Sequence, residues 1–227
     1  MQGFLSESLR KIHKQSSKKQ KDLRDGIDKA LAELVQVQEA VQAGAEVKQQ
    51  IMSRIGLVFE PFCLACDSKN AKMASYGLDC IGKLMEHAFL ADDGGLVDRA
   101  VECVCDCFQI ADDEIQLQII QVLLNGVMVP TSNVHEGSLL TTVRTVYNIY
   151  LNSRNVTNVG TAHTAMQQML DKVYERMEAA VRAAQPSQAD HPASVYSTLN
   201  RAGRVSRLLL RTVPFAGRPG SDERSQY

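Results

Sequence analysis

Apolar residues recur at intervals of three and four along most of the chain, with polar residues between them. This is the period of an amphipathic helix. Between residues 22 and 41 the stripe consists of Leu23, Ile27, Leu31, Leu34, Gln38 and Val41, with Gln38 as one polar interruption. No segment alternates apolar and polar residues over the length of a strand, so the sequence predicts an all-α protein.

The same spacing predicts a series of helices separated by short breaks. They cover residues 4–12, 22–41, 46–66, 73–85, 96–108, 113–129, 136–152 and 161–184. Pro61 should kink the third segment or begin a new helix, and the run Asp92 to Gly95 should form a turn. We expect residues 155–160 to form a loop and Thr161 to act as the N-cap of the last helix.

The last two predicted helices carry well-defined apolar stripes. For residues 136–152 the stripe is Leu139, Leu140, Val143, Val146, Tyr147 and Tyr150, and for residues 161–184 it is Ala162, Met166, Met169, Leu170, Val173 and Met177. Successive helices without an exact repeat fit an irregular bundle or a stack of helix pairs. Because many stripes are wide, we expect an armadillo/HEAT-like stack of antiparallel helix pairs.

The composition changes sharply at Gln185. From there to the end Pro, Ser, Ala and Gly dominate, Lys is absent, and six Arg face three acidic residues. Such a segment cannot bury enough apolar surface to fold alone. We therefore expect a helical domain over residues 1–184 and a disordered tail over 185–227, in which residues 205–213 could form one short basic amphipathic turn.

The overall charge argues against nucleic acid as a partner. Lys and Arg together number 25 and Asp and Glu 26, and there is no Trp, so the chain has neither a general basic field nor stacking platforms. Seven basic residues lie between Arg10 and Arg24, enough to approach anionic lipid. A solvated helix face explains this run better.

Export and membrane insertion have no support in the sequence. The N-terminus has no continuous apolar region of the kind that signal peptides require. The uncharged run from Ile115 to Val134 contains several Gln and Pro130, which are costly in hydrocarbon, so we interpret it as a buried helix. In a reducing compartment the six cysteines should remain thiols.

The cysteines raise the question of zinc or thiol chemistry. The pair Cys63 and Cys66 and the run Cys103, Cys105 and Cys107 have spacings that occur in zinc sites and redox motifs. Both groups lie inside helical patterns, so small core residues are the preferred interpretation. The five His residues are scattered, and no phosphate loop or nucleophile elbow occurs. We predict no catalytic residue, no metal site and no cofactor.

Several separate stretches, in order, resemble one family. They are residues 61–66 (PFCLAC), 78–84 (LDCIGKL), 115–120 (IQLQII), 135–140 (HEGSLL), 143–153 (VRTVYNIYLNS) and 161–170, which ends in MQQML. Over about residues 3–182 the chain resembles the DCB domain, the dimerisation and cyclophilin-binding module at the N-terminus of the large Arf guanine nucleotide exchange factors of the BIG class.

The resemblance implies a non-catalytic, all-helical interaction module acting in vesicle-mediated transport. Such a module self-associates, packs against a HUS-type domain, binds a cyclophilin, and is recruited to trans-Golgi and endosomal membranes by activated Arf-like GTPases. It is cytoplasmic and peripheral to the membrane. In the family, nucleotide exchange belongs to a separate central domain. The Arg-rich tail departs from the family pattern, in which a HUS region would follow.

Two sets of residues are candidates for partner binding. Tyr76, Asp79, Lys83 and His87 share one helix side, opposite the apolar stripe of Ile81, Leu84 and Met85. The resemblance implies that a lysine matching Lys83 belongs to the GTPase site, where an aromatic and acidic switch surface would meet it. The second set is Arg144, Tyr147, Asn148, Tyr150 and Asn152, in which the tyrosines should be half-buried anchors.

Three classes of function remain open at this point. The favoured one is the exchange-factor recruitment module. A generic helical-repeat scaffold predicts the same fold without a nucleotide-dependent partner. A thiol or zinc enzyme would require bound zinc or a reactive cysteine of low pKa.

Overall fold

A computed structural model describes residues 1–90, 94–130, 134 and 136–184. Within these residues all regular structure is helical, as the sequence predicts. The elements are α1 (Gln2–Gln15), α2 (Lys21–Gln42), α3 (Val47–Met52), α4 (Ile55–Asp67), α5 (Ala71–Glu86), α6 (Gly94–Asp106), the 3₁₀ turn η1 (Cys107–Gln109), α7 (Asp113–Met128), α8 (Glu136–Asn152) and α9 (Val156–Ala184). The predicted tail, residues 185–227, lies outside the described part of the chain.

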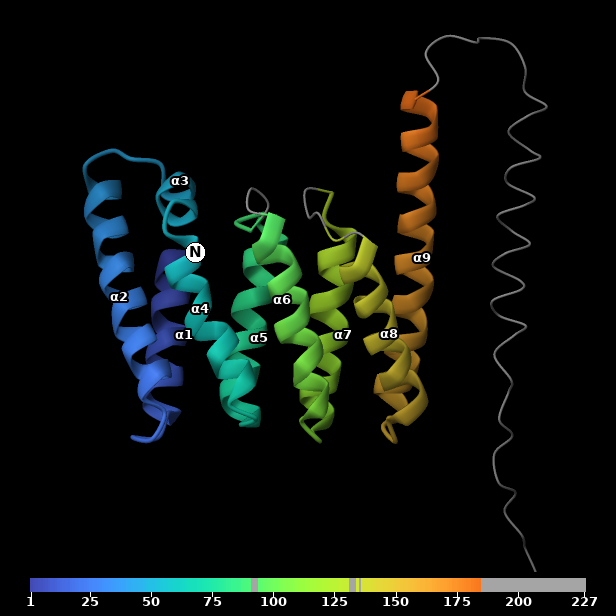
Figure 1. The fold of residues 1–227 in the computed structure, drawn as a ribbon, viewed down its shortest axis with the longest axis horizontal. Coiled ribbons are helices and arrows are strands. Elements are labelled where there is room, and N and C mark those ends of the chain that lie inside the picture. The colour runs from blue at the N-terminus through green and yellow to red at the C-terminus, as the bar shows by residue number, and fades with distance from the viewer. Residues whose placement is uncertain (91–93, 131–133, 135, 185–227) are drawn as a thin grey trace, which may run out of the picture. The chain divides into compact units, whose positions relative to one another are not determined.

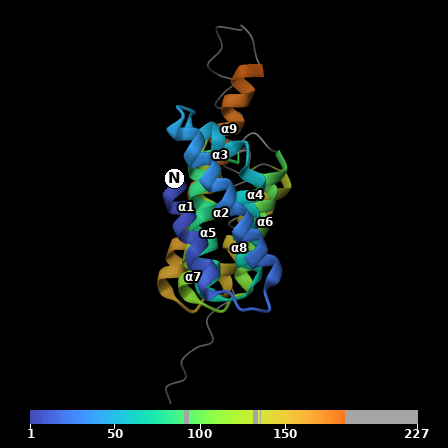
Figure 2. The same ribbon diagram turned by 90° about the vertical axis from the view of Figure 1, so that its left-hand side faces the viewer.

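Residues 1–177 form one compact unit built as a two-layered stack (Figure 1). One layer contains α1, α5 and α7 in that order, and the other contains α2, α4, α6 and α8. Across the layers α1 packs on α2, α4 on α5, and α6 on α7, as the view along the stack shows (Figure 2). The expected stack of antiparallel helix pairs is therefore confirmed.

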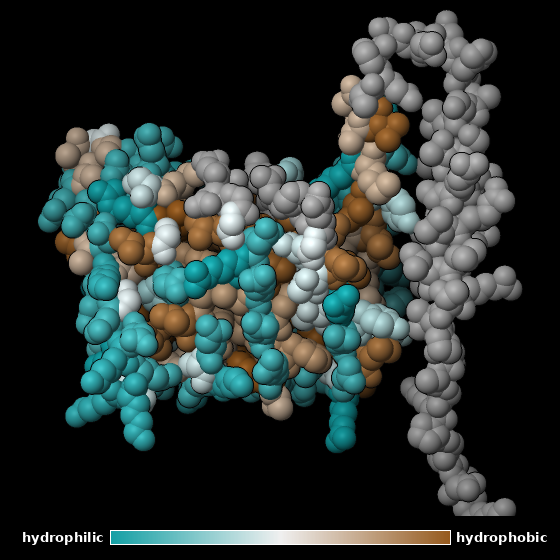
Figure 3. Space-filling model, viewed as in Figure 1, coloured by the Kyte–Doolittle hydropathy of each residue, from teal (hydrophilic) through white to brown (hydrophobic). Residues whose placement is uncertain are grey.

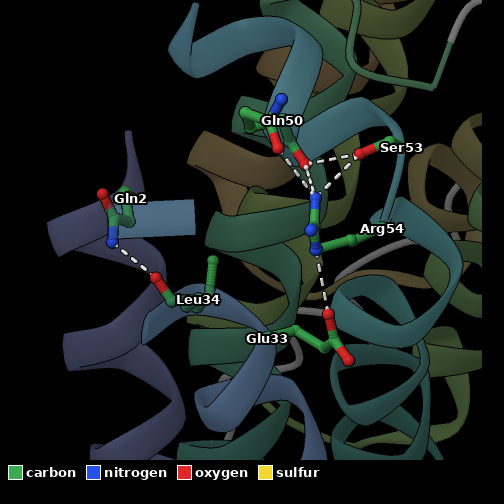
Figure 4. Close-up of polar contacts among 6 residues, drawn as sticks. All are labelled: Gln2, Glu33, Leu34, Gln50, Ser53 and Arg54. Atoms are coloured by element: carbon green, nitrogen blue, oxygen red, sulfur yellow. Dashed lines mark hydrogen bonds and ion pairs between the residues drawn. The ribbon is translucent and has the colours of Figure 1, made fainter. Parts of the chain in front are cut away.

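Polar side chains link each pair of helices to the next. Arg54 forms an ion pair with Glu33 of α2 (Nε to Oε2, 3.0 Å) and donates to Gln50 Oε1 at 2.9 Å (Figure 4). Arg99 of α6 reaches Glu60 of α4 at 2.7 Å. These contacts join neighbouring helices of one layer, whereas apolar burial supplies most of the stability.

Helices α4 and α5 pack closely against each other. A Cβ added at Gly77 of α5 would lie 2.9 Å from both Cys66 Sγ and the Phe62 carbonyl oxygen of α4. Any larger residue would push the two backbones apart. Phe59 and Phe62 of α4 are fully buried beside this contact, so the centre of the core lies between these two helices.

Several predicted boundaries were wrong. The break in residues 46–66 comes at Ser53 and Arg54, and Pro61 lies buried within α4. Helix α5 ends at Glu86, one residue beyond the predicted end, but Gly94 and Gly95, expected in the turn, already belong to α6. Asp92 and Asp93, the start of the expected turn, lie outside the described residues.

The start of α9 was also predicted wrongly. Residues 156–160 are helical, and the N-cap is Asn155 instead of Thr161. The Asn155 side-chain oxygen accepts from the backbone N–H of Thr157 at 2.9 Å and of Asn158 at 3.4 Å. Asn is among the best N-cap residues, so the loop-like composition of this segment concealed a helix start.

The burial pattern corrects parts of the predicted stripes. Gln38 is exposed and Val37 is buried in its place, and Val47 is exposed. In α8 the fully or nearly buried residues are Thr142, Thr145, Val146 and Ile149, while Leu140 is 60% exposed. In α9 Ala162, Ala165 and Met169 are buried, while Leu170 and Met177 are exposed. The end of the stack therefore presents more apolar surface than the sequence predicts.

No helix in the described ranges is both long and apolar enough to span a lipid bilayer. The segment from Ile115 onwards forms α7, whose residues Ile119, Ile120, Leu123 and Val127 are buried between its neighbours.

Candidate partner-binding surfaces

The first candidate surface is built on the exposed side of α5. Asn70 caps this helix, its Oδ1 accepting from the N–H of Lys72 at 3.1 Å and of Met73 at 3.2 Å. The cap fixes the start of the helix, and burial of its apolar side leaves Asp79 and Lys83 outward and half exposed. Lys83 Nζ lies 3.7 Å from Asp79 Oδ1, one turn away. Such an exposed pair contributes little to stability, so both groups are available to a partner.

Helix α1 contributes residues that the sequence interpretation missed. Lys83 Nζ lies 3.5 Å from the centroid of the Phe4 ring, a close cation–π contact. Lys11 Nζ lies 5.8 Å above the Tyr76 ring and forms an ion pair with Glu7 at 2.7 Å. We name the group formed by Phe4, Glu7, Lys11, Tyr76, Asp79 and Lys83 the α1/α5 surface. The spacing of residues 4, 7 and 11 could have shown that they share one helix side, but not that α5 is their neighbour.

The charges on this surface stabilise one another. Lys11 holds the pKa of the Glu7 carboxyl below its ordinary value through a hydrogen bond, and the same bond raises the pKa of Lys11. Cys80 lies buried beneath the surface and does not reach it. The α1/α5 surface therefore carries two cations, two anions and two aromatic rings.

His87 does not join this group. It is the C-cap residue of α5, and its ring approaches Phe89 edge-on with the ring centroids 6.5 Å apart. Phe89 lines an open hollow of about 620 Å³ together with Glu46, Lys48 and Met52. Of the four residues predicted for this site, the structure thus brings together Tyr76, Asp79 and Lys83 and places His87 at the edge.

The second predicted set lies on α8, where it divides between two sides. Tyr150 packs against the core and tilts towards His163 of α9, with ring centroids 5.9 Å apart, and Tyr147 stacks on Tyr150 at 6.4 Å. Asn152 donates to the Asn148 carbonyl at 2.8 Å, which satisfies a backbone group of the last turn. Arg144 is exposed. The tyrosines are half-buried, as predicted, and Asn152 serves its own helix.

The cysteines are core residues in this fold. Five of the six are buried, and Cys105 is partly buried. The Cys63 thiol of α4 lies within hydrogen-bonding reach of Cys103 of α6, and Cys66 is similarly close to Cys107. The contact with Cys107, together with burial, raises the pKa of Cys66 well above its ordinary value. Among the described residues no cluster of His, Cys, Asp and Glu could hold a metal ion.

The N-terminal basic run lies at the turn between α1 and α2. Lys14, Lys18, Lys19 and Lys21 are exposed, and long hydrophilic side chains project from the end of the stack where this turn lies (Figure 3). His13 approaches Asp28 of α2 at 3.9 Å, and Arg24 donates to the Ser16 carbonyl at 3.4 Å. These contacts are those of a solvated helix end.

Comparison with known proteins places the chain among exchange-factor N-termini. The family model described as "Mon2/Sec7/BIG1-like, dimerisation and cyclophilin-binding domain" matches residues 1–181. Human brefeldin A-inhibited guanine nucleotide-exchange protein 1 is 35% identical over 200 residues, covering 77% of this chain and 11% of the relative. Brefeldin A-inhibited guanine nucleotide-exchange protein 2 of Arabidopsis thaliana is 36% identical over 131 residues, covering 54% of this chain and 7% of the relative.

A more distant relative shows the same pattern. The ADP-ribosylation factor guanine nucleotide-exchange factor sec71 of Schizosaccharomyces pombe is 28% identical over 185 residues, covering 78% of this chain and 10% of that protein. The chain thus spans about a tenth of the length of the relatives it matches. The similarity concerns the helical stack that carries both candidate surfaces.

Proposed function

The chain belongs to the family of Mon2/Sec7/BIG1-like dimerisation and cyclophilin-binding (DCB) domains, and from this membership we propose that it is a non-catalytic recruitment module of a large Arf guanine nucleotide exchange factor. Its α1/α5 surface binds an Arf-like small GTPase in the GTP form. By this contact the module brings the exchange factor to trans-Golgi and endosomal membranes during vesicle-mediated transport. Other surfaces of the module serve self-association, packing with a HUS-type domain and cyclophilin binding.

The observation that carries the proposal is the fixed position of Lys83. Its ammonium group is held between the Phe4 ring at 3.5 Å and the Asp79 carboxylate at 3.7 Å, yet the side chain keeps 39% of its exposure. A long side chain that is already ordered loses less conformational entropy when a partner binds. Lys83 can therefore meet an acidic group of a GTPase at a lower entropic cost than a freely rotating lysine.

The surroundings of Lys83 add specificity. The Tyr76 and Phe4 rings supply apolar area, and Glu7 and Asp79 supply negative charge beside the two lysines. Aromatic anchors within a mixed charged rim are typical of protein-binding hot spots. A general helical scaffold would have no reason to bind one nucleotide state of a GTPase, so nucleotide dependence separates the two functions.

The test is a binding assay of the full chain against purified Arf and Arf-like GTPases, each loaded with GDP or with a GTP analogue. We expect one GTPase to bind in the GTP form only and Lys83→Glu to weaken binding at least about tenfold. Lys29→Glu, at an exposed lysine of α2, is the matched control and should bind normally. Absence of binding to every loaded GTPase would contradict the proposal and favour the generic scaffold.

A further inference from the structure

Helix α8 carries a partly exposed stripe on the side opposite its buried residues. The stripe consists of Leu140, Arg144, Tyr147 and Leu151. Leu140 is 60% exposed and Leu151 55% exposed, whereas the opposite side of the helix, with Thr142, Val146 and Ile149, is buried. At about 100° per residue the four side chains fall within about 60° of arc. Apolar surface is visible at the end of the stack where α8 lies (Figure 3).

The stripe has the same spacing in both directions. The intervals along the sequence are four, three and four residues, with a leucine at each end and the Arg144 and Tyr147 pair inside. If two copies of this helix lie antiparallel about a two-fold axis, Leu140 of each copy faces Leu151 of the other, and Arg144 of each faces Tyr147 of the other. An isologous interface requires this kind of self-complementarity.

We propose that α8 pairs with α8 of a second copy of this chain through the stripe Leu140, Arg144, Tyr147 and Leu151. The inference rests on the self-association in the proposed function and locates it. It commits to antiparallel pairing, because a parallel pair would place Arg144 against Arg144 and leave two guanidinium groups facing each other.

The chemistry of each facing pair is favourable. The two leucine pairs remove apolar surface from water at both ends of the contact. At the centre, each Arg144 guanidinium lies over a Tyr147 ring of the partner, a cation–π contact. Tyr147 is already stacked on Tyr150, with ring centroids 6.4 Å apart, so its ring is ordered before the partner arrives.

The size of the stripe sets the strength of the dimer. Its ends lie eleven residues apart, which corresponds to about 16 Å along a helix. One helix side of this length offers less surface than a standard protein interface, which buries about 800 Å² on each partner. We therefore expect a dimer that dissociates on dilution rather than an obligate one.

Sedimentation velocity of the full chain over a range of concentrations tests the pairing. The wild-type chain should shift from monomer to dimer as its concentration rises. Leu151→Glu should weaken dimerisation at least about tenfold, since it places a carboxylate against Leu140 of the partner. Leu57→Glu, at a leucine of α4 that is 52% exposed, is the matched control and should dimerise like the wild type.

Exchanging Arg144 and Tyr147 tests whether these residues contact the partner or only stabilise their own helix. Tyr147→Arg alone places two arginines opposite each other across the axis and should abolish the dimer. Adding Arg144→Tyr restores an arginine opposite each tyrosine, so the double variant should dimerise again although both side chains differ from the wild type. Circular dichroism and GTPase binding, which uses the other layer, report whether each variant is folded.

The outcomes distinguish the two proposals. A wild-type chain that stays monomeric at every concentration contradicts self-association itself and, with it, this interface. A wild-type dimer that persists in Leu151→Glu, or a double variant no better than Tyr147→Arg alone, overturns the α8 pairing while self-association stands. Loss in both single variants together with recovery in the double variant supports the pairing.

Discussion

Gly77 shows how much one residue determines in this fold. A methyl group there would lie 2.9 Å from the Phe62 carbonyl oxygen, which belongs to a helical backbone and cannot move cheaply. We predict that Gly77→Ala lowers the free energy of unfolding by about 1–3 kcal/mol. The measurement is urea unfolding followed by circular dichroism.

Gly56 of α4 is the matched control for this prediction. It also lies in a helix, but nothing lies within 4 Å of a Cβ added there. Gly56→Ala should raise the free energy of unfolding by about 0.5–1 kcal/mol, because alanine has the higher helix propensity. If both variants changed the free energy of unfolding in the same direction, the close approach of α4 to Gly77 of α5 would be contradicted.

Cys80 and Cys105 are among the buried thiols that make the free energy of unfolding depend on pH. Burial raises the pKa of Cys80 to about 12 and that of Cys105 to about 11, from an ordinary value of 9.0. Above pH 9 the unfolded chain releases these protons while the folded chain retains them. The contribution of these two thiols to the free energy of unfolding is therefore fully present below pH 9. Above pH 9 the free energy of unfolding falls by up to about 1.4 kcal/mol per pH unit per thiol until the pH reaches the folded-state pKa.

Urea unfolding at pH 8 and pH 10.5 measures this effect. The variant carrying Cys80→Ala and Cys105→Ala should lose less stability between the two pH values than the wild-type chain, although it is less stable at pH 8. Equal losses in the two proteins would show that these thiols titrate normally in the folded state.

At the residue scale the sequence could predict the cysteines but not the whole candidate site. Cys63, Cys66, Cys103 and Cys107 fall on apolar helix positions, so their core role follows from periodicity. Phe4 and Lys11 could not be assigned to the α1/α5 surface, because their contacts with Lys83 and Tyr76 join residues more than sixty positions apart. Periodicity describes one helix and does not identify its neighbour.

At the scale of the elements, the start of α9 differs from the one that the sequence predicts. Asn155 caps it through the N–H groups of Thr157 and Asn158, and Asn155 Nδ2 also donates to Asp113 Oδ2 at 3.1 Å. We predict that Asn155→Ala lowers the free energy of unfolding by about 1 kcal/mol. Hydrogen exchange of the first turn of α9 should become faster in the same variant.

Thr161 provides the comparison. It lies inside α9, one and a half turns beyond the cap, where alanine is at least as good a helix former. Thr161→Ala should therefore change stability by less than about 0.5 kcal/mol. A larger effect from Thr161→Ala than from Asn155→Ala would support the later helix start that composition predicted.

The sequence predicts most of the helices correctly. It predicts less well which side of each helix is buried. Helix α7 begins at the predicted Asp113, where Asp112 caps it, and α8 has both predicted bounds. Leu140 was expected in the core and is exposed. The error has a physical cause, since a helix at the end of a stack keeps an apolar side that no neighbour in the stack covers.

On the scale of the whole molecule, the two proposed surfaces lie on different layers. The α1/α5 surface belongs to the layer of α1, α5 and α7, and the stripe of α8 belongs to the other. Binding of a GTPase and pairing of two copies can therefore occur together. Two linked modules on one membrane would bind with higher avidity than one.

Cross-linking tests the direction of the pairing. A chain with Leu140→Cys and a chain with Leu151→Cys, mixed under mild oxidation, should form a disulfide-linked heterodimer. Neither variant alone should cross-link efficiently, because in an antiparallel pair its two new thiols lie at opposite ends of a stripe about 16 Å long. Cross-linking of each variant with itself would indicate parallel pairing.

The most direct test of the central claim is the calorimetric titration of a GTP-analogue-loaded GTPase with three chains: wild type, Lys83→Glu, and the charge-reversed pair Asp79→Lys with Lys83→Glu. The reversed pair keeps an ion pair between consecutive turns of α5 but removes the cation from above the Phe4 ring. If Lys83 contacts the GTPase, both variants should bind at least about tenfold more weakly than the wild type. If the reversed pair binds as well as the wild type, Lys83 only supports its own helix, and recruitment through the α1/α5 surface is contradicted.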